Sequence, residues 1–286
     1  MKIKYTPEGK AYLNIGCGSI FSNEWTNIDF FRKRNIDFCD IRKPLPYPND
    51  VFDAVYSSHV LEHLAKDKGE NIISEIFRIL KNGGICRIVV PDTEKICVEY
   101  LERLKKCMSQ PIEKNIKNYK WIEIMLIDQM VREKPGGFML TTLKNGDFNS
   151  KYVKKWIDDE LSINFSSNYN DLSSNIVKKT KFMIGMKKKL LSKTPKDLAL
   201  YLCFLFNKMR FLIFHANPQK TGEVHKWMYN RLSLKLLMEK YGFINFSVNK
   251  FNISRIEYWE RYNLDKSTYG NFPRKPESIY IECKKS

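Results

Sequence analysis

The segment from Tyr12 to Ser19 constrains the fold more than any other, because an apolar run ends there abruptly in a Gly-x-Gly turn. The run predicts a short buried strand, and Gly16 and Gly18 predict a tight loop directly after it. Glycine suits such a loop because it adopts backbone conformations that other residues avoid and lets a ligand approach the main chain closely. The third glycine of the dinucleotide-binding pattern Gly-x-Gly-x-x-Gly is missing, so this turn alone does not identify a ligand.

The rest of the first third of the chain alternates strand-like and helix-like segments. Further short runs predict strands at 25–29, 35–40, 52–57 and 85–90. Residues 69–80 carry apolar side chains at a spacing near 3.6, which predicts an amphipathic helix, and Asn82-Gly83-Gly84 predicts the turn that ends it. Such alternation is typical of a parallel α/β sheet, whose carboxyl edge is where ligands bind.

Taken together, these motifs resemble the class I S-adenosylmethionine-dependent methyltransferases, especially their small type 11 domains, over about residues 11–93. The motifs that carry the resemblance are the Gly-x-Gly loop, a strand ending in Asp29, Asp40-Ile41, Phe52 to Leu64, and Lys81-Asn82-Gly83-Gly84 with the strand after it. As an ordered set they are highly specific. A weaker second block, His225 to Tyr229, Leu236 to Phe243 and Arg274 to Ser278, is similar to predicted methyltransferases encoded among bacterial surface-glycan genes.

The resemblance implies a Rossmann-like, seven-stranded, mostly parallel sheet with an antiparallel last strand. The core is expected at 1–107 and 223–286, and a mostly helical insertion after the fifth strand is expected at 108–222. Helical patterns at 121–131, 152–161 and 198–214 support the insertion. Beyond it, we expect a helix at 232–241, a sixth strand at 244–248 and the antiparallel seventh strand at 278–283. Because Ser22-Asn23-Glu24 follows the first loop so soon, the family's helix there is expected to be short or absent.

S-adenosylmethionine is the cofactor that the resemblance implies. In the family, the first loop wraps the methionine part, the acid after the second strand binds the ribose, and the end of the third strand contacts adenine. Carried over to this sequence, the cofactor-binding residues are expected to be Asn14, Gly16, Cys17, Gly18, Asp29, Asp40, Ile41, Ser57, Ser58 and His59.

Histidines are the candidate general bases, because imidazole titrates near neutrality. We consider His59 and His225 for this role. The alternatives stay open: His59 could contact the cofactor or a backbone carbonyl, His225 could be a buried structural histidine, and His63 is expected to buttress the loop. No compact Asp/His ligand motif stands out, so no metal site is predicted, although Asp92 and Glu223 could contribute ligands.

The acceptor is expected to be a sugar hydroxyl, in a surface polysaccharide or its nucleotide- or lipid-linked precursor. Trp227 and Tyr229 offer aromatic faces for a sugar, and Arg274 either binds an anion or is solvated. The alternatives are a methyltransferase acting on nucleic acid or another small molecule, and a non-catalytic methyltransferase-like scaffold. Nucleic acid is the weaker alternative because the sequence contains no helix-turn-helix, zinc module or other recognisable reader.

Positive charge is concentrated outside the expected core. The chain has 49 Lys and Arg against 32 Asp and Glu, a formal net charge of +17, and residues 111–220 alone contribute 20 against 10. This excess is compatible with nucleic acid, an anionic membrane, an anionic substrate, or no specific partner at all.

Residues 187–214 join a lysine run to an apolar stretch that is shorter than the about 20 residues a membrane span needs. We expect a buried helix, a homodimer contact or an interfacial membrane helix there. The seven cysteines form no Cys-x-x-Cys pair, and no signal peptide is recognised. A cytoplasmic protein is therefore expected, with peripheral attachment to the inner face of the membrane as the alternative.

Overall fold

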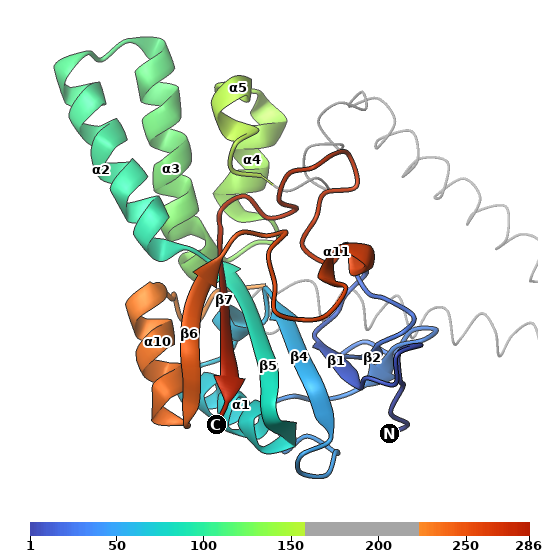
Figure 1. Ribbon diagram of the computed structural model, residues 1–286. Coiled ribbons are helices and arrows are strands. Elements are labelled where there is room, and N and C mark those ends of the chain that lie inside the picture. The colour runs from blue at the N-terminus through green and yellow to red at the C-terminus, as the bar shows by residue number, and fades with distance from the viewer. Residues whose placement is uncertain (158–222) are drawn as a thin grey trace, which may run out of the picture.

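The computed structural model describes residues 1–157 and 223–286, and seven strands in these segments form one mixed sheet (Figure 1). The strands are β1 (Tyr12–Ile15), β2 (Thr26–Asp29), β3 (Asp37–Phe38), β4 (Phe52–Ser58), β5 (Leu80–Pro91), β6 (Phe243–Asn249) and β7 (Ser278–Lys285). Their order across the sheet is β3-β2-β1-β4-β5-β7-β6, and only β7 runs against its neighbours. The predicted Rossmann-like sheet with an antiparallel last strand is confirmed.

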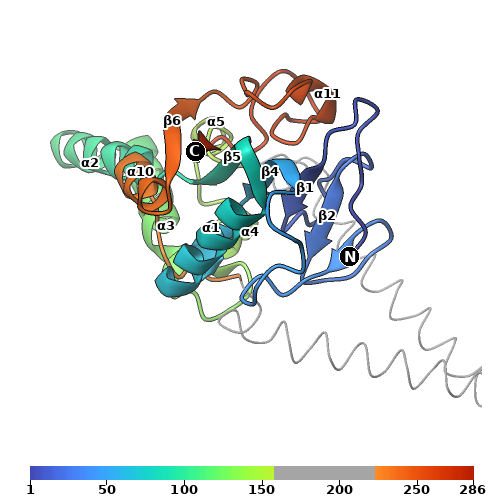
Figure 2. The same ribbon diagram turned by 60° about the horizontal axis from the view of Figure 1, so that its bottom comes forward.

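One face of the sheet is covered by α1 (Lys66–Ile79) and α10 (Arg231–Lys240), as Figure 2 shows. Helix α1 has its isoleucines on one stripe, and Ile73, Ile76 and Ile79 are almost completely buried in the main core. Burying each such side chain contributes about 1.5–3 kcal/mol relative to leaving it in water.

The glycine turn at 82–84 does not end α1, and the prediction of a glycine C-cap was wrong. Helix α1 ends at Ile79, and Leu80 is already extended because its backbone pairs with Phe52 of β4. Gly83, with φ of 74°, lies inside β5, where the register between β4 and β5 shifts. The glycines therefore accommodate an irregularity of the strand.

The opposite face is covered by the C-terminal loop that contains the short helix α11 (Trp259–Tyr262) (Figure 2). Its aromatic side chains pack with Tyr12, Trp25 and Tyr56 in a second core cluster. Arg87 of β5 is fully buried beneath this loop, and its guanidinium donates to Asp265 at 2.9 Å and to Glu282 at 2.8 Å.

A helical arm rises beyond the carboxyl end of β5 (Figure 1). It consists of α2 (Thr93–Ser109), α3 (Glu113–Val131), α4 (Gly137–Asn145) and α5 (Ser150–Val153). These helices have a core of their own, built around Trp121, Ile122 and Met125. The predicted helix at 121–131 is part of α3. Of the one predicted at 152–161, the described residues 152–157 include the end of α5 and a following turn, and the rest lies outside the described residues. The domain boundary predicted after residue 107 falls in the last turn of α2.

The segment 187–214, with its predicted dimer or membrane contact, lies outside the described residues. Among the helices that the structure does describe, none has the length and apolar character required to cross a bilayer.

Candidate active site

The carboxyl ends of β1, β2 and β4 lie side by side, because Ile15 pairs with Ile28 on one side and with Ser57 on the other. Directly after Ile15 the chain turns through Gly16 and Gly18, both in the left-handed region with φ of 65° and 57°. Between β1 and β2 the described chain contains turns and no helix, as expected from the early Ser22-Asn23-Glu24.

Gly16 and Gly18 have different surroundings. A Cβ atom on Gly16 would lie 2.3 Å from Cγ2 of Val60, so the turn after β4 packs directly on the backbone of the loop. A Cβ on Gly18 would have no atom within 4 Å. The loop is thus closed against Val60 on one side and open at Gly18 on the other, where a ligand can approach the main chain.

Asp29 ends β2 beside this loop. Its carboxylate accepts hydrogen bonds from the main-chain N–H groups of Gly18 and Phe31, each at 2.9 Å. A carboxylate offers about four lone-pair positions, so both oxygens retain acceptor capacity for a further donor. Asp29 therefore positions the loop and still has the capacity to bind hydroxyl groups.

Three of the predicted cofactor residues make internal contacts instead of presenting free polar groups. Asn14 Nδ2 donates to the carbonyl of Ile20 at 3.1 Å, and Ser57 Oγ donates to the carbonyl of Ile15 at 3.3 Å. Cys17 is buried, and this burial, together with the charge of Asp29, raises the pKa of its thiol to about 12. These side chains hold the loop in place.

Ser58, by contrast, has a buried Oγ with no hydrogen-bond partner among the described residues. A buried polar atom left unpaired costs about 1–3 kcal/mol, so a ligand that supplies a partner at this position would be stabilised.

Asp40 and Ile41 follow the short strand β3. Arg42 donates to both carboxylate oxygens of Asp40, at 2.7 and 2.8 Å, and this pairing lowers the pKa of the carboxyl. Ile41 packs against the main core. A contact from Asp40 to an adenine amino group would have to share the carboxylate with Arg42.

His59 stands at the end of β4 with an unusual backbone, φ of 55°. Its Nδ1 is 3.1 Å from Glu62 Oε1, and its Nε2 is 2.7 Å from Ser278 Oγ and 3.8 Å from Glu277 Oε1. Both ring nitrogens are thus engaged, and only 15% of the side chain is exposed. To accept a proton from a substrate, the imidazole has to exchange its contact with Ser278 for one with the acceptor.

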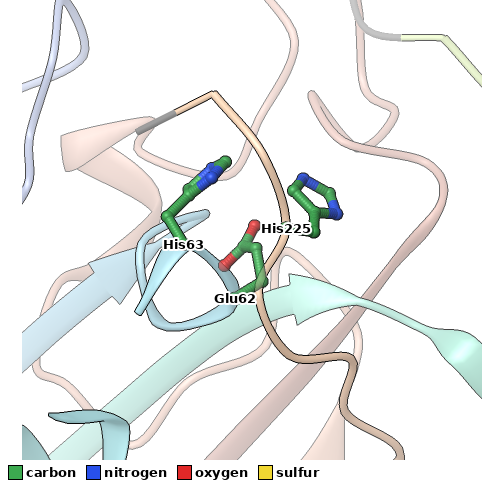
Figure 3. Close-up of side chains that lie close together, drawn as sticks. All are labelled: Glu62, His63 and His225. Carbon is green, nitrogen blue, oxygen red and sulfur yellow. The ribbon is translucent and has the colours of Figure 1, made fainter. Parts of the chain in front are cut away.

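A second group of side chains, shown in Figure 3, contacts His59 through Glu62. Glu62 and His63 belong to η1 (Leu61–His63), and His225 comes from the loop before α10. One ligand-type atom from each lies within 4.8 Å of the other two. The two imidazole rings pack edge to face with their centres 4.9 Å apart, and the carboxylate of Glu62 lies beside the pair in Figure 3. The main chain holds the two segments together, because the N–H groups of Lys226 and Trp227 both donate to the carbonyl of Glu62.

The electrostatic interactions within this group favour an ionised Glu62 beside a neutral His225. Burial alone would favour the protonated acid, but His59, His63 and His225 together hold the pKa of Glu62 low, at about 2. Burial lowers the pKa of His225 to about 3. His225 is therefore neutral at pH 7 and has a lone pair to offer.

Glu223 and Asp92 were predicted to be possible contributors of metal ligands, but the carboxylates of both have structural partners. Glu223 accepts from Arg132 at 2.8 Å and from the N–H of Gly136 at 2.6 Å. Asp92 caps α2 by accepting from the N–H of Lys95. The grouping around Glu62 was missed because His225 is far from Glu62 and His63 in the chain, so no local spacing reveals it.

The three predicted substrate contacts differ in accessibility. Trp227 is 38% exposed, and Lys66 Nζ lies 4.8 Å from the centre of its ring. Tyr229 is buried in the main core, where its hydroxyl approaches Gly69, because its backbone pairs with Asp92 and turns the ring inward. Arg274 Nε donates to the carbonyl of Leu264. Of the three, only Trp227 offers an open face.

Residues 24–88 of the chain, from β2 into β5, match the family model described as a methyltransferase domain. The match supports a class I S-adenosylmethionine-dependent methyltransferase and implies S-adenosylmethionine as the cofactor. No curated protein matches the chain.

Solved structures of methyltransferases also match. One from Archaeoglobus fulgidus is 13% identical over 96% of this chain and 85% of its own, with a TM-score of 0.37. A possible histamine N-methyltransferase from Thermotoga maritima is 12% identical over 96% and 81%, with a TM-score of 0.36. One from Mesorhizobium loti is 19% identical over 29% and 46%, with a TM-score of 0.24. For the first structures matched, the chain spans 37%, 46% and 53% of their length.

Proposed function

We propose that this protein transfers the methyl group of S-adenosylmethionine to a hydroxyl of a sugar, in a surface polysaccharide or in its nucleotide- or lipid-linked precursor. The observation that carries the proposal is the edge formed by β1, β2 and β4. There, the open backbone at Gly18, the carboxylate of Asp29 and the unpaired hydroxyl of Ser58 come from neighbouring strand ends.

These residues fit the chemistry of the cofactor. The Asp29 carboxylate is suited to two adjacent ribose hydroxyls, because it accepts charge-assisted hydrogen bonds in pairs. Gly18 leaves space for the methionine part to reach the main chain. Ser58 Oγ would gain the partner it lacks.

The bound cofactor would supply a methyl group that is already activated by a positively charged sulfur. The remaining task of the chain is to align the acceptor oxygen and to remove its proton. His59 is suited to both, because Glu62 holds its Nδ1 at 3.1 Å and so fixes the orientation of the ring. The same carboxylate would stabilise the positive charge that the imidazole acquires with the proton.

A basic groove supports an anionic acceptor. It has a volume of about 920 Å³ and lies between α2, α3 and α5. Seven lysines and arginines and two glutamates belong to its lining, and Lys95 Nζ lies 5.2 Å from the centre of the Trp156 ring. Sugars linked to a nucleotide or a lipid carry phosphate groups, which such a groove would attract.

The cofactor part is tested by calorimetric titration of S-adenosylmethionine into the wild type, Asp29→Asn and the control Asp37→Asn. Losing a hydrogen bond to a charged group costs about 1.5–3 kcal/mol, so Asp29→Asn should weaken binding about tenfold or more while Asp37→Asn leaves it unchanged. No binding to the folded wild type would support the scaffold alternative and overturn the proposal.

The acceptor part is tested with methyl-labelled cofactor and a panel of nucleotide sugars, lipid-linked sugars and glycan fragments. Label in a sugar hydroxyl is the expected result. Label only in RNA or DNA, with binding that falls steeply as salt rises, would instead assign the protein to nucleic acid methylation.

A further inference from the structure

We infer that Glu62, His63 and His225 form a binding site for one divalent transition-metal ion. The three side chains converge from two segments that are distant in the chain, and Figure 3 shows them directed toward one another. Their ligand-type atoms lie within 4.8 Å of each other.

The donor set selects the class of ion. Two imidazoles and one carboxylate suit Zn²⁺, Fe²⁺, Co²⁺ or Mn²⁺, whereas Mg²⁺ and Ca²⁺ prefer oxygen ligands alone. In a tetrahedral site with bonds near 2.1 Å, the ligands stand about 3.4 Å apart. The distances between the three atoms therefore need to shorten by at most about 1.4 Å, which side-chain rotations can provide.

Unpaired buried atoms point to a missing partner. Glu62 Oε2 and the Nδ1 of His225 are buried and lack a hydrogen-bond partner among the described residues, and Glu62 is completely buried. Glu62 Oε1 lies 3.1 Å from His59 Nδ1. Buried polar groups are nearly always paired, and a cation among these atoms would satisfy all of them at once.

The surroundings also resemble those of metal ligands. His63 Nδ1 lies 3.3 Å from the carbonyl of Val224, so it can donate there and leave Nε2 free as a ligand. Metal-binding histidines usually have their second nitrogen fixed in this way. The two main-chain hydrogen bonds to the Glu62 carbonyl fix the loop that carries His225. The site is thus supported before any ion arrives.

The location of the metal site assigns the ion a role in methyl transfer. This step rests on the proposed function. Val60, two residues before Glu62, packs on Gly16 of the cofactor loop, and His59 contacts Glu62 directly. Three protein ligands leave coordination positions for oxygen atoms of a substrate. The ion would orient a sugar hydroxyl beside the cofactor and lower its pKa.

The test begins with the full chain after treatment with a chelator and removal of the chelator. Zn²⁺, Co²⁺, Mn²⁺ and Mg²⁺ are titrated separately by calorimetry, and the visible spectrum is recorded with Co²⁺. The variants are Glu62→Gln, His63→Gln and His225→Gln. Glu223→Gln serves as the matched control, because it removes a carboxylate from the same loop but outside the cluster.

We expect one tightly bound transition-metal ion per wild-type chain and weak or undetectable Mg²⁺ binding. Each ligand variant should lose at least about 100-fold in affinity, and the control should bind as the wild type does. The Co²⁺ spectrum should report nitrogen ligation and disappear in His63→Gln. Because His225 is buried, the partly exposed His63 provides the variant with the lower risk of misfolding.

Circular dichroism and S-adenosylmethionine affinity are measured on every sample. A folded wild type that binds the cofactor but none of the ions would overturn the metal site and leave the proposed function standing. Ion binding that is unchanged in folded His63→Gln and Glu62→Gln would also overturn it. If the protein binds an ion but not S-adenosylmethionine, the metal site would be supported and the methyltransferase function would be rejected.

Discussion

The Cα of Gly16 faces the side chain of Val60 so closely that a Cβ at position 16 would lie 2.3 Å from Val60 Cγ2. The loop after β1 and the turn after β4 are therefore in direct contact. One of these segments carries the expected cofactor contacts, and the other carries His59, Glu62 and His63.

This contact predicts that Gly16→Ala and Gly18→Ala differ in stability. Both positions have positive φ, which costs a non-glycine residue about 1–2 kcal/mol. Only Gly16→Ala also collides with Val60, so it should destabilise the protein by about 1–3 kcal/mol more than Gly18→Ala. Urea unfolding of both variants measures the difference, and equal losses would contradict the packing described here.

The buried ion pairs of Arg87 predict a large effect of Arg87→Met. Asp265 would keep the hydrogen bond from Tyr56, and Glu282 would keep those from Ser254 and Arg255. Both buried carboxylates would lose the guanidinium between them, and breaking such pairs costs about 3–5 kcal/mol. Arg261→Met is the control, because Arg261 pairs with Glu8 and Glu24 at the surface, where ion pairs contribute little to stability. Denaturant midpoints compare the two. A loss at Arg87 no larger than that at Arg261 would be inconsistent with the network.

We predict that the hydrogen bonds of Glu75 make the stability of the protein depend on pH. Hydrogen bonds from Arg78, opposed by partial burial, lower the pKa of its carboxyl in the folded state, and the N–H of Leu45 adds a further bond. The unfolded pKa is about 4.3, so the stabilisation is fully present above about pH 5 and is lost as the pH falls through the lower, folded pKa.

Glu75→Gln should therefore lower the urea midpoint at pH 7 and have less effect at the lowest pH at which the protein still folds. Midpoints measured from pH 7 downward provide the check. The prediction would be contradicted if the difference in urea midpoint between the wild type and Glu75→Gln became larger as the pH falls.

His59→Gln should separate catalysis from cofactor binding. If His59 removes the acceptor proton, the turnover number should fall about 10²–10⁴-fold while the affinity for S-adenosylmethionine is retained. Ser278→Ala, which removes a neighbour 2.7 Å from His59 Nε2, should retain activity. Turnover and calorimetric affinity are measured together, and a loss confined to affinity would assign His59 to cofactor binding instead.

Much of the sheet was predictable because its signals are local. The apolar run before Gly16 and the run before Asp29 both form strands within a residue or two of the expected limits. The strand expected at 35–40 shrinks to Asp37–Phe38, since it pairs only with β2 at the sheet edge. Leu80 illustrates the opposite case, because its pairing with Phe52 overrides the turn propensity of the glycines that follow.

The site was less predictable because its contacts join distant parts of the chain. The aromatic character of Tyr229 indicated a substrate contact, but its pairing with Asp92 turns it into the core. The Glu62-His63 pair was visible, whereas its convergence with His225 depends on the hydrogen bonds of Lys226 and Trp227 to the Glu62 carbonyl. One local signal in the sequence was overlooked. Arg87 stands within an apolar strand, and a buried arginine needs buried acidic side chains as partners.

Strand β7 lies between β5 and β6 although both precede it in the chain. While the protein is being synthesised, β5 therefore has an unpaired edge, and the nascent Arg87 lacks Asp265 and Glu282 until the ribosome has translated past them. An open strand edge beside an unpaired cation attracts chaperones and other chains alike. Cooperative folding of the sheet must then wait for translation of β7.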